Sequence, residues 1–249
     1  MDNAIADDGF FFGLGAFETI AVENGQAVFF DRHMQRLKRA LDFLGIRHCA
    51  LDIESAARAA LATHPDTDRA ALKVTVTERN IIADIRPNPY RPEHYARGFL
   101  TTLSAVRRNE TSPFAAHKTL NYGDNIFEKR RAQARGFDEP IFLNTNGFIA
   151  EGACSNVFFA RDGRLYTPDP ACGLLDGIMR SFVCAHADVT ERPIAADEAS
   201  SFDEMFLTNS LFGIMPVRSL DDVQFSSRTW SRSLMETYNQ YLNRYFYSK

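Results

Sequence analysis

The stretch "AAHKTLNYGDN" at residues 115–125 decides how the chain is interpreted, because it sets one lysine, Lys118, among small, apolar and amide side chains. A solvated surface lysine is the ordinary explanation of such a residue. The alternative is an amine held in a catalytic pocket, where it acts as a nucleophile towards a carbonyl group. The other motifs of the chain decide between these two explanations.

The composition excludes several classes of protein. The chain has 249 residues, 45% hydrophobic and 24% charged, with a net charge of -4, which suffices for one large domain or two small ones. The mixed charges argue against nucleic acid and membrane surfaces as partners, and no apolar run approaches a membrane span or a signal peptide. The four cysteines are scattered without a CxxC pair. We therefore expect no metal site and a reduced, cytoplasmic protein.

The first half of the chain alternates strands and helices. Residues 16–30 predict a β-hairpin that turns at the Asn-Gly pair 24–25. A helix follows, with Asp31 as its expected N-cap and Gly45 as its expected end. Residues 52–64 predict a second helix.

The stretch "ALKVTVT" at residues 71–77 alternates apolar and polar side chains, which is typical of a strand. Lys73 lies on the polar face with two threonines. That face lines a cavity or faces solvent, and the pattern alone does not decide between the two. Residues 81–86 and 98–106 predict further strands.

The second half has the same mixed character. Residues 123–136 predict a helix, which closely spaced strands follow at 140–143, 147–151, 155–160 and 164–168. A helix over residues 176–187 has Asp176 as its expected N-cap, and residues 203–210 predict a strand. A long amphipathic helix is expected over residues 226–246.

These elements predict an α/β protein with two domains. The N-terminal α/β domain is expected over residues 1–106 and the C-terminal α/β domain over residues 117–249. Residues 107–116 are the expected linker, because the stretch "RRNETSP" is polar and ends in a proline.

Four groups of residues carry the functional groups that hold pyridoxal 5'-phosphate. They are Arg36 on a helix, Lys118, Glu151 at a strand end, and the glycine turn 173–180 with the Thr-Asn-Ser run 208–210 downstream. A lysine forms an imine with the cofactor aldehyde, and a carboxylate keeps the pyridine nitrogen protonated. A helix N-terminus and an arginine bind phosphate. Each group also has an ordinary structural explanation, so composition and spacing alone do not select this cofactor.

The order of the motifs resembles a known family. "GLGAFET", "RHMQRLKRAL", "HKTLNY", "GFIAEGACSNVFF", "GLLDGIMR" and "LTNSLFGIMPV" resemble the class IV (fold type IV) pyridoxal-phosphate family of branched-chain aminotransferases, D-amino acid aminotransferases and 4-amino-4-deoxychorismate lyases. The resemblance runs from about Gly9 to the C-terminal helix. It implies a two-domain class IV aminotransferase-like fold, a C-terminal domain that binds the cofactor, the cofactor between domains, and a homodimer.

The resemblance also assigns roles to individual residues. Lys118 corresponds to the Schiff-base lysine and Glu151 to the partner of the pyridine nitrogen. The other implied cofactor contacts are Arg36, Ile178, Met179 and Ser210 at the phosphate, Leu175 against the ring, and Tyr122 beside the ring hydroxyl. Ser155 and Asn156 shape the pocket behind Glu151 or hold the strand corner. The chain departs from the family in its short N-terminal region and in Met179, which replaces a hydroxyl-bearing residue.

Three details resemble the lyase branch most: "GIMRSF" at 177–182, "MPVRSLDDVQFSS" at 215–227, and the combination of Thr19 with Lys73. In lyases of this family a threonine and a lysine at these positions contact the substrate, and a dicarboxylate substrate needs a cation there. The resemblance thus implies a carbon-oxygen lyase of folate biosynthesis that releases pyruvate and 4-aminobenzoate, with Lys118 as the base and Thr19 near the leaving group.

Two other functions stay open on the sequence. A class IV aminotransferase acting on branched-chain or D-amino acids would use the same Arg36, Lys118 and Glu151. A non-catalytic module with this fold would be expected to lose Lys118 or Glu151, and the chain has both.

Overall fold

The structure, a computed structural model, describes residues 4–64 and 69–247. The chain divides into two compact units. The N-terminal unit comprises the residues up to 89 together with 117–123, and the C-terminal unit comprises 90–116 and the residues from 124 onwards. This division differs from the boundary expected at 107–116. The reason is hydrogen bonding, because residues 99–108 form a strand that pairs with two strands of the C-terminal unit.

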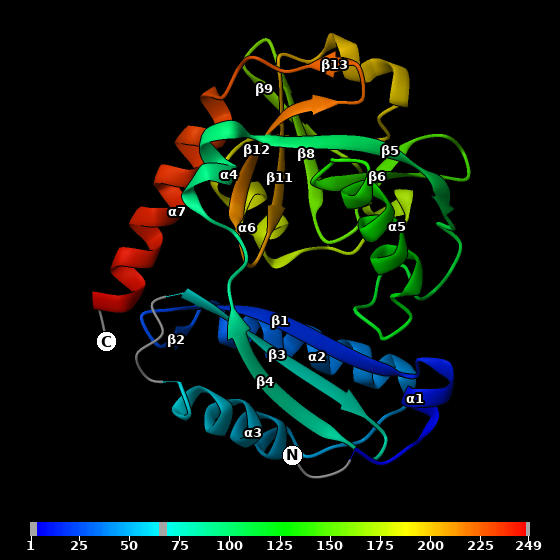
Figure 1. Cartoon of the computed structure of the whole chain (residues 1–249), viewed down its shortest axis with the longest axis vertical. Helices are drawn as coiled ribbons and strands as arrows, with labels where there is room; N and C mark the ends of the chain where they lie inside the picture. The colour runs from blue at the N-terminus through cyan, green and yellow to red at the C-terminus, as the bar shows by residue number, and fades with distance from the viewer. Residues whose placement is uncertain (1–3, 65–68, 248–249) are drawn as a thin grey trace. The chain divides into compact units, whose positions relative to one another are not determined.

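The N-terminal unit is a four-stranded antiparallel sheet covered on one face by two helices (Figure 1). The strands are, in sheet order, β2 (Gln26–Ala27), β1 (Gly15–Glu23), β3 (Arg69–Thr77) and β4 (Ile81–Pro87). The helices on this face are α2 (Phe30–Leu44) and α3 (Ala50–Ala62), and a short helix α1 (Asp8–Phe12) precedes the sheet. Alternate apolar residues of the strands and the inner faces of α2 and α3 form its core.

The alternation predicted for residues 71–77 is confirmed. Leu72, Val74 and Val76 are fully buried under the helices, whereas Lys73 is exposed on the other face. Thr19 of β1 lies directly opposite Lys73 in the antiparallel register. Because directly opposed residues point to the same face of a sheet, Thr19 and Lys73 are neighbours there.

The predicted turn of the hairpin is also confirmed. Asn24 and Gly25 both have positive φ, 51° and 72°, as a two-residue hairpin turn of type I′ requires. The second strand is shorter than expected, since β2 ends at Ala27 and the chain then enters α2.

Of the two predicted ends of α2, one is confirmed and one is wrong. Gly45 ends the helix with a φ of 71°, as expected. The expected N-cap was wrong: the cap is Phe29, and Asp31 lies inside the first helical turn. An acidic side chain there still interacts favourably with the helix dipole.

The C-terminal unit is built on a nine-stranded mixed sheet in the order β10-β9-β8-β11-β12-β5-β6-β7, with β13 paired to β12. The strands are β5 (Phe99–Arg108), β6 (Glu139–Asn144), β7 (Ile149–Gly152), β8 (Asn156–Arg161), β9 (Arg164–Thr167), β10 (Val189–Glu191), β11 (Glu204–Asn209), β12 (Gly213–Leu220) and β13 (Val223–Gln224). The helices are α4 (Pro92–Arg97), α5 (Gly123–Ala134), α6 (Ile178–His186) and α7 (Thr229–Tyr247), with 3-10 turns at Pro170–Cys172 and Ala196–Ser201. Helix α7 packs along β12 and β11 (Figure 1).

Strand β12 was not predicted from the sequence, and Pro216 stands in its interior, where proline is uncommon in a central strand. Pro216 lies opposite Phe206 of β11, and the strand is buried over most of its length. Packing of its apolar side chains into the core of this unit outweighs the missing N–H group.

None of the helices in the described part of the chain is long and apolar enough to cross a membrane.

A prediction about stability follows from the start of α7. Glu204 is fully buried, and its carboxylate accepts hydrogen bonds from the N–H groups of Trp230 (3.0 Å) and Ser231 (2.7 Å). Glu204→Gln should lower the free energy of unfolding in urea by about 1–3 kcal/mol, because it weakens buried charged hydrogen bonds. Glu236→Gln, on the exposed side of α7, is the matched control and should change it by less than about 0.5 kcal/mol. Equal effects of the two variants would contradict this account of the helix start.

Candidate active site

A buried ionic cluster joins β1 to α2 in the N-terminal unit. Glu18 and His33 are fully buried, and Arg36 is 7% exposed. Both Nε and Nη2 of Arg36 donate to Glu18, each at 2.7 Å, and Nδ1 of His33 lies 2.7 Å from the same carboxylate. The bidentate pair fixes the guanidinium plane of Arg36 against the sheet.

The charges of this cluster follow from burial and from the three partners. Burial alone would raise the pKa of Glu18, but Arg36 and His33 hold it well below its ordinary value. Burial lowers the pKa of His33 despite the neighbouring carboxylate. Neutral His33 donates its Nδ1 proton to Glu18, and its Nε2 atom is buried without a hydrogen-bond partner among the described residues.

The opposite face of β1 carries the predicted lysine. The Phe17 N–H donates to the carbonyl of Lys118 at 3.0 Å, and the Leu120 N–H donates to Gly15 at 2.8 Å. Residues 118–120 therefore extend the sheet beside β1. This backbone pairing places the Lys118 amine 4.3 Å from the centre of the Phe17 ring.

Several predicted residues meet around that ring. The Lys73 amine lies 5.1 Å from the centre of the Phe17 ring, and the Tyr122 ring packs edge-on against it with centroids 5.2 Å apart. Thr19, two residues after Phe17 in β1, is on the same face. The structure thus brings Thr19, Lys73, Lys118 and Tyr122 together, whereas Arg36 contacts Glu18 on the helix-covered face.

In the C-terminal unit, Glu151 stands near the end of β7 and is 8% exposed. Its Oε1 accepts from Nη2 of Arg108 at 2.8 Å, and its Oε2 accepts from the Leu175 N–H at 3.1 Å. Arg108 also donates to Asn125 at 3.0 Å and lies over the Phe142 ring at 4.6 Å. One neighbouring strand, β5, and one loop therefore fix the Glu151 carboxylate.

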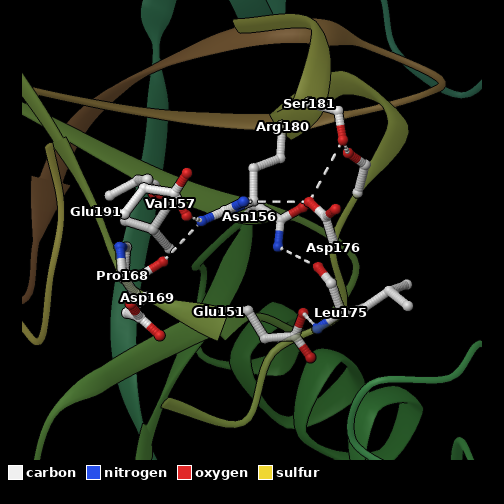
Figure 2. A network of polar contacts seen from close by, with 12 residues as sticks. Glu151, Asn156, Val157, Pro168, Asp169, Leu175, Asp176, Arg180, Ser181 and Glu191 are labelled. Atoms are coloured by element: carbon white, nitrogen blue, oxygen red, sulfur yellow. Dashed lines mark hydrogen bonds and ion pairs between the residues drawn. The ribbon is translucent and has the colours of Figure 1, made fainter. Parts of the chain in front are cut away.

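A side chain of β8 holds the loop that leads into α6. Nδ2 of Asn156 donates to the Leu175 carbonyl at 2.8 Å, so Leu175 is bound through both of its backbone polar groups (Figure 2). A Cβ atom on Gly177 would lie 2.1 Å from Oδ1 of Asn156. Only glycine therefore fits at this position against Asn156.

Helix α6 has no side-chain hydrogen bond from its N-cap residue. The expected N-cap Asp176 was wrong, because Gly177 occupies the cap position. The Asp176 carboxylate instead accepts from Nη1 of Arg180 at 3.1 Å (Figure 2). The first N–H groups of an α-helix, here including those of Ile178 and Met179, have no acceptor within the helix.

Other polar groups near this helix start favour an anion. Thr208 lies opposite Asn156 in the sheet, and its hydroxyl is buried without a hydrogen-bond partner among the described residues. Ser210 is half-buried in the turn that follows β11. Free helical N–H groups beside hydroxyls are the donors that phosphate groups take in proteins. The donors of this region fit a phosphate.

Ser155 and Asn156, whose role the sequence left open, both make contacts that hold the backbone in place. The Ser155 hydroxyl donates to Glu139 at 2.9 Å, while Asn156 binds the Leu175 loop. Their contacts match the structural alternative, in which they fix the strand corner.

Comparison with known proteins gives the family. The amino-transferase class IV family model matches residues 15–220, so the chain belongs to this family. Aminodeoxychorismate lyase of Bacillus subtilis is 27% identical over 243 residues, 90% of this chain and 83% of that protein. The crystal structure of 4-amino-4-deoxychorismate lyase from Pseudomonas aeruginosa has a TM-score of 0.86 and 27% identity, covering 95% of this chain and 94% of that one.

A relative from the other branch covers less of the chain. A probable branched-chain-amino-acid aminotransferase of Aquifex aeolicus is 33% identical over 135 residues, 51% of this chain and 43% of that protein. The predicted family and its mixed α/β fold are confirmed. Enzymes of this family depend on pyridoxal phosphate, so the predicted cofactor class is confirmed as well.

Sequence reasoning missed three residues that the structure places beside the predicted ones. Glu18 and His33 stood inside the quoted motifs "FET" and "HMQRL" but were given no role. Arg108 was assigned to the linker, although it is the ion-pair partner of Glu151. The only sequence signal for Arg108 was its place at the end of a strand pattern.

Arg108→Met should destabilise the protein, because it leaves the nearly buried Glu151 carboxylate without its cation. We expect a loss of about 1.5–3 kcal/mol in the free energy of unfolding by urea. Arg107→Met is the matched control, since Arg107 is exposed and next in sequence, and it should have little effect. An equal loss in both variants would show that the Glu151 pair contributes nothing specific.

A pH dependence follows from His33. Its pKa is lowered in the folded protein, so the unfolded chain binds a proton more readily, and stability rises with pH through the ordinary histidine range. Between pH 5.5 and 7.5 the wild type should gain up to about 1.4 kcal/mol per pH unit from this group. His33→Gln should flatten the slope in urea unfolding, whereas His64→Gln, at an exposed position, should not. An unchanged slope in His33→Gln would contradict this charge assignment.

Proposed function

We propose that the chain is a pyridoxal-phosphate-dependent 4-amino-4-deoxychorismate lyase, which releases 4-aminobenzoate and pyruvate in folate biosynthesis. The observation that carries the proposal is the Lys73 amine, which shares the Phe17 ring with Lys118 and lies opposite Thr19. A second cation beside the catalytic amine suits a substrate with two carboxylates. Similarity to the Bacillus subtilis lyase over 90% of the chain supports the same assignment.

The cofactor, when bound, supplies a carbonyl that condenses with amines and a ring that accepts electrons. We assign its binding to the following residues. Lys118 is the amine that holds it covalently, and Glu151 keeps the pyridine nitrogen protonated. The remaining proposed contacts are Arg36, Ile178, Met179 and Ser210 for the phosphate, Leu175 for the ring face and Tyr122 for the ring hydroxyl.

The residues of the chain have separate roles in the proposed reaction. The Lys118 amine would take the proton from the amine-bearing ring carbon of the substrate as a general base, while the cofactor would supply the group that accepts the electrons. Lys73 binds a substrate carboxylate and so orients the ring towards Lys118. The Thr19 hydroxyl stands beside Lys73, where it positions or protonates the departing enolpyruvyl group. Loss of pyruvate leaves the ring aromatic.

Two further properties belong to this proposal. Class IV enzymes act on small amino substrates, and we infer a homodimer for this chain on the strength of the family resemblance. A cytoplasmic location would suit an enzyme of folate biosynthesis.

A second candidate function is an aminotransferase acting on branched-chain or D-amino acids. The 33% identity to the Aquifex aeolicus protein over half of the chain favours it. In that reaction the same Lys118 would return the proton to the cofactor, and a keto acid would leave. Lys73 and Thr19 would then have no dicarboxylate to bind.

The test is the formation of fluorescent 4-aminobenzoate from 4-amino-4-deoxychorismate by the cofactor-loaded protein. Lys73→Ala should lower kcat/KM about tenfold to hundredfold, as expected for one lost charged hydrogen bond, and Thr19→Ala should lower kcat. Lys38→Ala, which removes a lysine from the exposed side of α2, is the control and should match the wild type. A loaded enzyme that forms no product, yet transfers the amine of D-alanine or L-leucine, would replace the lyase with the aminotransferase.

A further inference from the structure

A second buried ion pair lies beside the Glu151 corner, in the C-terminal unit. Lys129 of α5 donates to Oε2 of Glu139 at the start of β6. The Glu139 side chain is 1% exposed and that of Lys129 14%. Burial alone would lower the pKa of Lys129, but Glu139 raises it above its ordinary value, so the lysine stays charged at neutral pH.

The other oxygen of Glu139 binds the chain that follows Glu151. Oε1 accepts from the Cys154 N–H at 2.7 Å and from the Ser155 hydroxyl at 2.9 Å. A Cβ atom on Gly152 would lie 2.8 Å from this same oxygen. The corner at residues 152–155 is thus packed directly on the Glu139 carboxylate.

The corner itself is a closed turn. The Gly152 N–H donates to the Ser155 carbonyl at 2.7 Å, and Nδ2 of Asn125 donates to the Ala153 carbonyl at 2.7 Å. Glu151 precedes this turn by one residue in β7. Any shift of the corner therefore moves the backbone that carries Glu151.

The corner also binds the turn that carries Ser210. Nδ2 of Asn209 donates to the Cys154 carbonyl at 3.1 Å, and Oδ1 of Asn209 accepts the N–H groups of Leu211 and Phe212, each at 2.9 Å. One chain of contacts thus runs from Lys129 through Glu139 and the corner to the end of β7, which carries Glu151, and to the turn that carries Ser210.

We propose that the Lys129–Glu139 pair is a positioning pair, which sets the affinity for pyridoxal phosphate by holding the Glu151 corner and the Ser210 turn in register. Neither residue is among the proposed cofactor contacts. The inference rests on the proposed function, in that Glu151 and Ser210 are taken to bind the cofactor. Its basis is the division of the Glu139 carboxylate between one buried cation and the two donors of the corner.

Glu139→Gln tests the pair with little change of shape. A neutral amide has only one acceptor atom, so whichever way it turns, its NH₂ group faces either the Lys129 ammonium or the Cys154 N–H. Titration of the apoprotein with pyridoxal phosphate, followed by absorbance, should give a Kd about tenfold higher than that of the wild type. The absorption spectrum of the bound cofactor should also shift as Glu151 moves.

Glu204→Gln is the matched control. Glu204 is also a fully buried glutamate that accepts backbone N–H groups and lies near a serine hydroxyl, but it stands at the other end of β11 from Asn209. Glu204→Gln should lower stability and leave the Kd for the cofactor unchanged. The control thereby separates an effect on cofactor affinity from an effect on the stability of the fold.

A double variant separates charge balance from positioning. Lys129→Met alone leaves a buried carboxylate without its cation and should be strongly destabilising. The double variant Lys129→Met with Glu139→Leu removes both charges and should regain most of that stability. Its cofactor affinity should stay low, because the corner donors have still lost their acceptor.

Two outcomes would overturn the inference while the proposed function stands. One is a Glu139→Gln variant whose Kd and bound-cofactor spectrum match those of the wild type. The other is a double variant that regains affinity together with stability, which would show a merely structural role. A wild-type protein that binds no pyridoxal phosphate at all would refute the proposed function itself.

Discussion

The Glu151 carboxylate is held by Arg108 on one oxygen and by the Leu175 backbone on the other, and these two bonds join strand β5 and the loop before α6 to strand β7. A carboxylate this deeply buried is costly unless cations and N–H donors surround it. Strand β5 delivers the cation, and the loop before α6 delivers the donor. The same loop leads into α6, whose N-cap residue makes no side-chain hydrogen bond. The carboxylate and the helix start are therefore positioned by one piece of backbone.

In the N-terminal unit, the two faces of strand β1 carry different groups of residues. Glu18 points towards α2 and ties down Arg36, while Phe17 and Thr19 point the other way with Lys73. Alternation along β1 thus places the Glu18–Arg36 ion pair on one face and Phe17, next to the Lys118 amine, on the other. The aromatic surroundings of Lys118 come from Phe17 and Tyr122, and its place is set by backbone pairing with β1.

Local patterns of the sequence predicted the local parts of this structure. The Asn-Gly turn, the alternation around Lys73 and the glycine end of α2 depend on neighbouring residues only, and all three are confirmed. Both expected N-caps were one or two residues away from the true ones, which are Phe29 and Gly177. Strand β12 was missed, and there the packing of apolar side chains into the core outweighs the poor strand propensity of Pro216.

The candidate site could be assembled from the sequence only through the family motifs. No local sequence pattern links Lys118 to Glu151. Arg108 pairs with a carboxylate 43 residues away. Ion pairs across such separations depend on the fold, so no pattern around Arg108 indicates its partner. The lysine and the carboxylate were found as motifs, whereas the backbone pairing that places Lys118 and the Arg108 cation that holds Glu151 were found only in the structure.

Peptide mapping after borohydride reduction of the cofactor-loaded protein is the sharpest test of whether Lys118 is the amine that binds the cofactor. Reduction makes the lysine–cofactor bond permanent, and mass spectrometry then finds the modified residue. The account predicts a phosphopyridoxyl group on Lys118 and loss of the visible absorption of the protein. A label on Lys73 or Lys129, or no label on a protein that carries the cofactor, would contradict it.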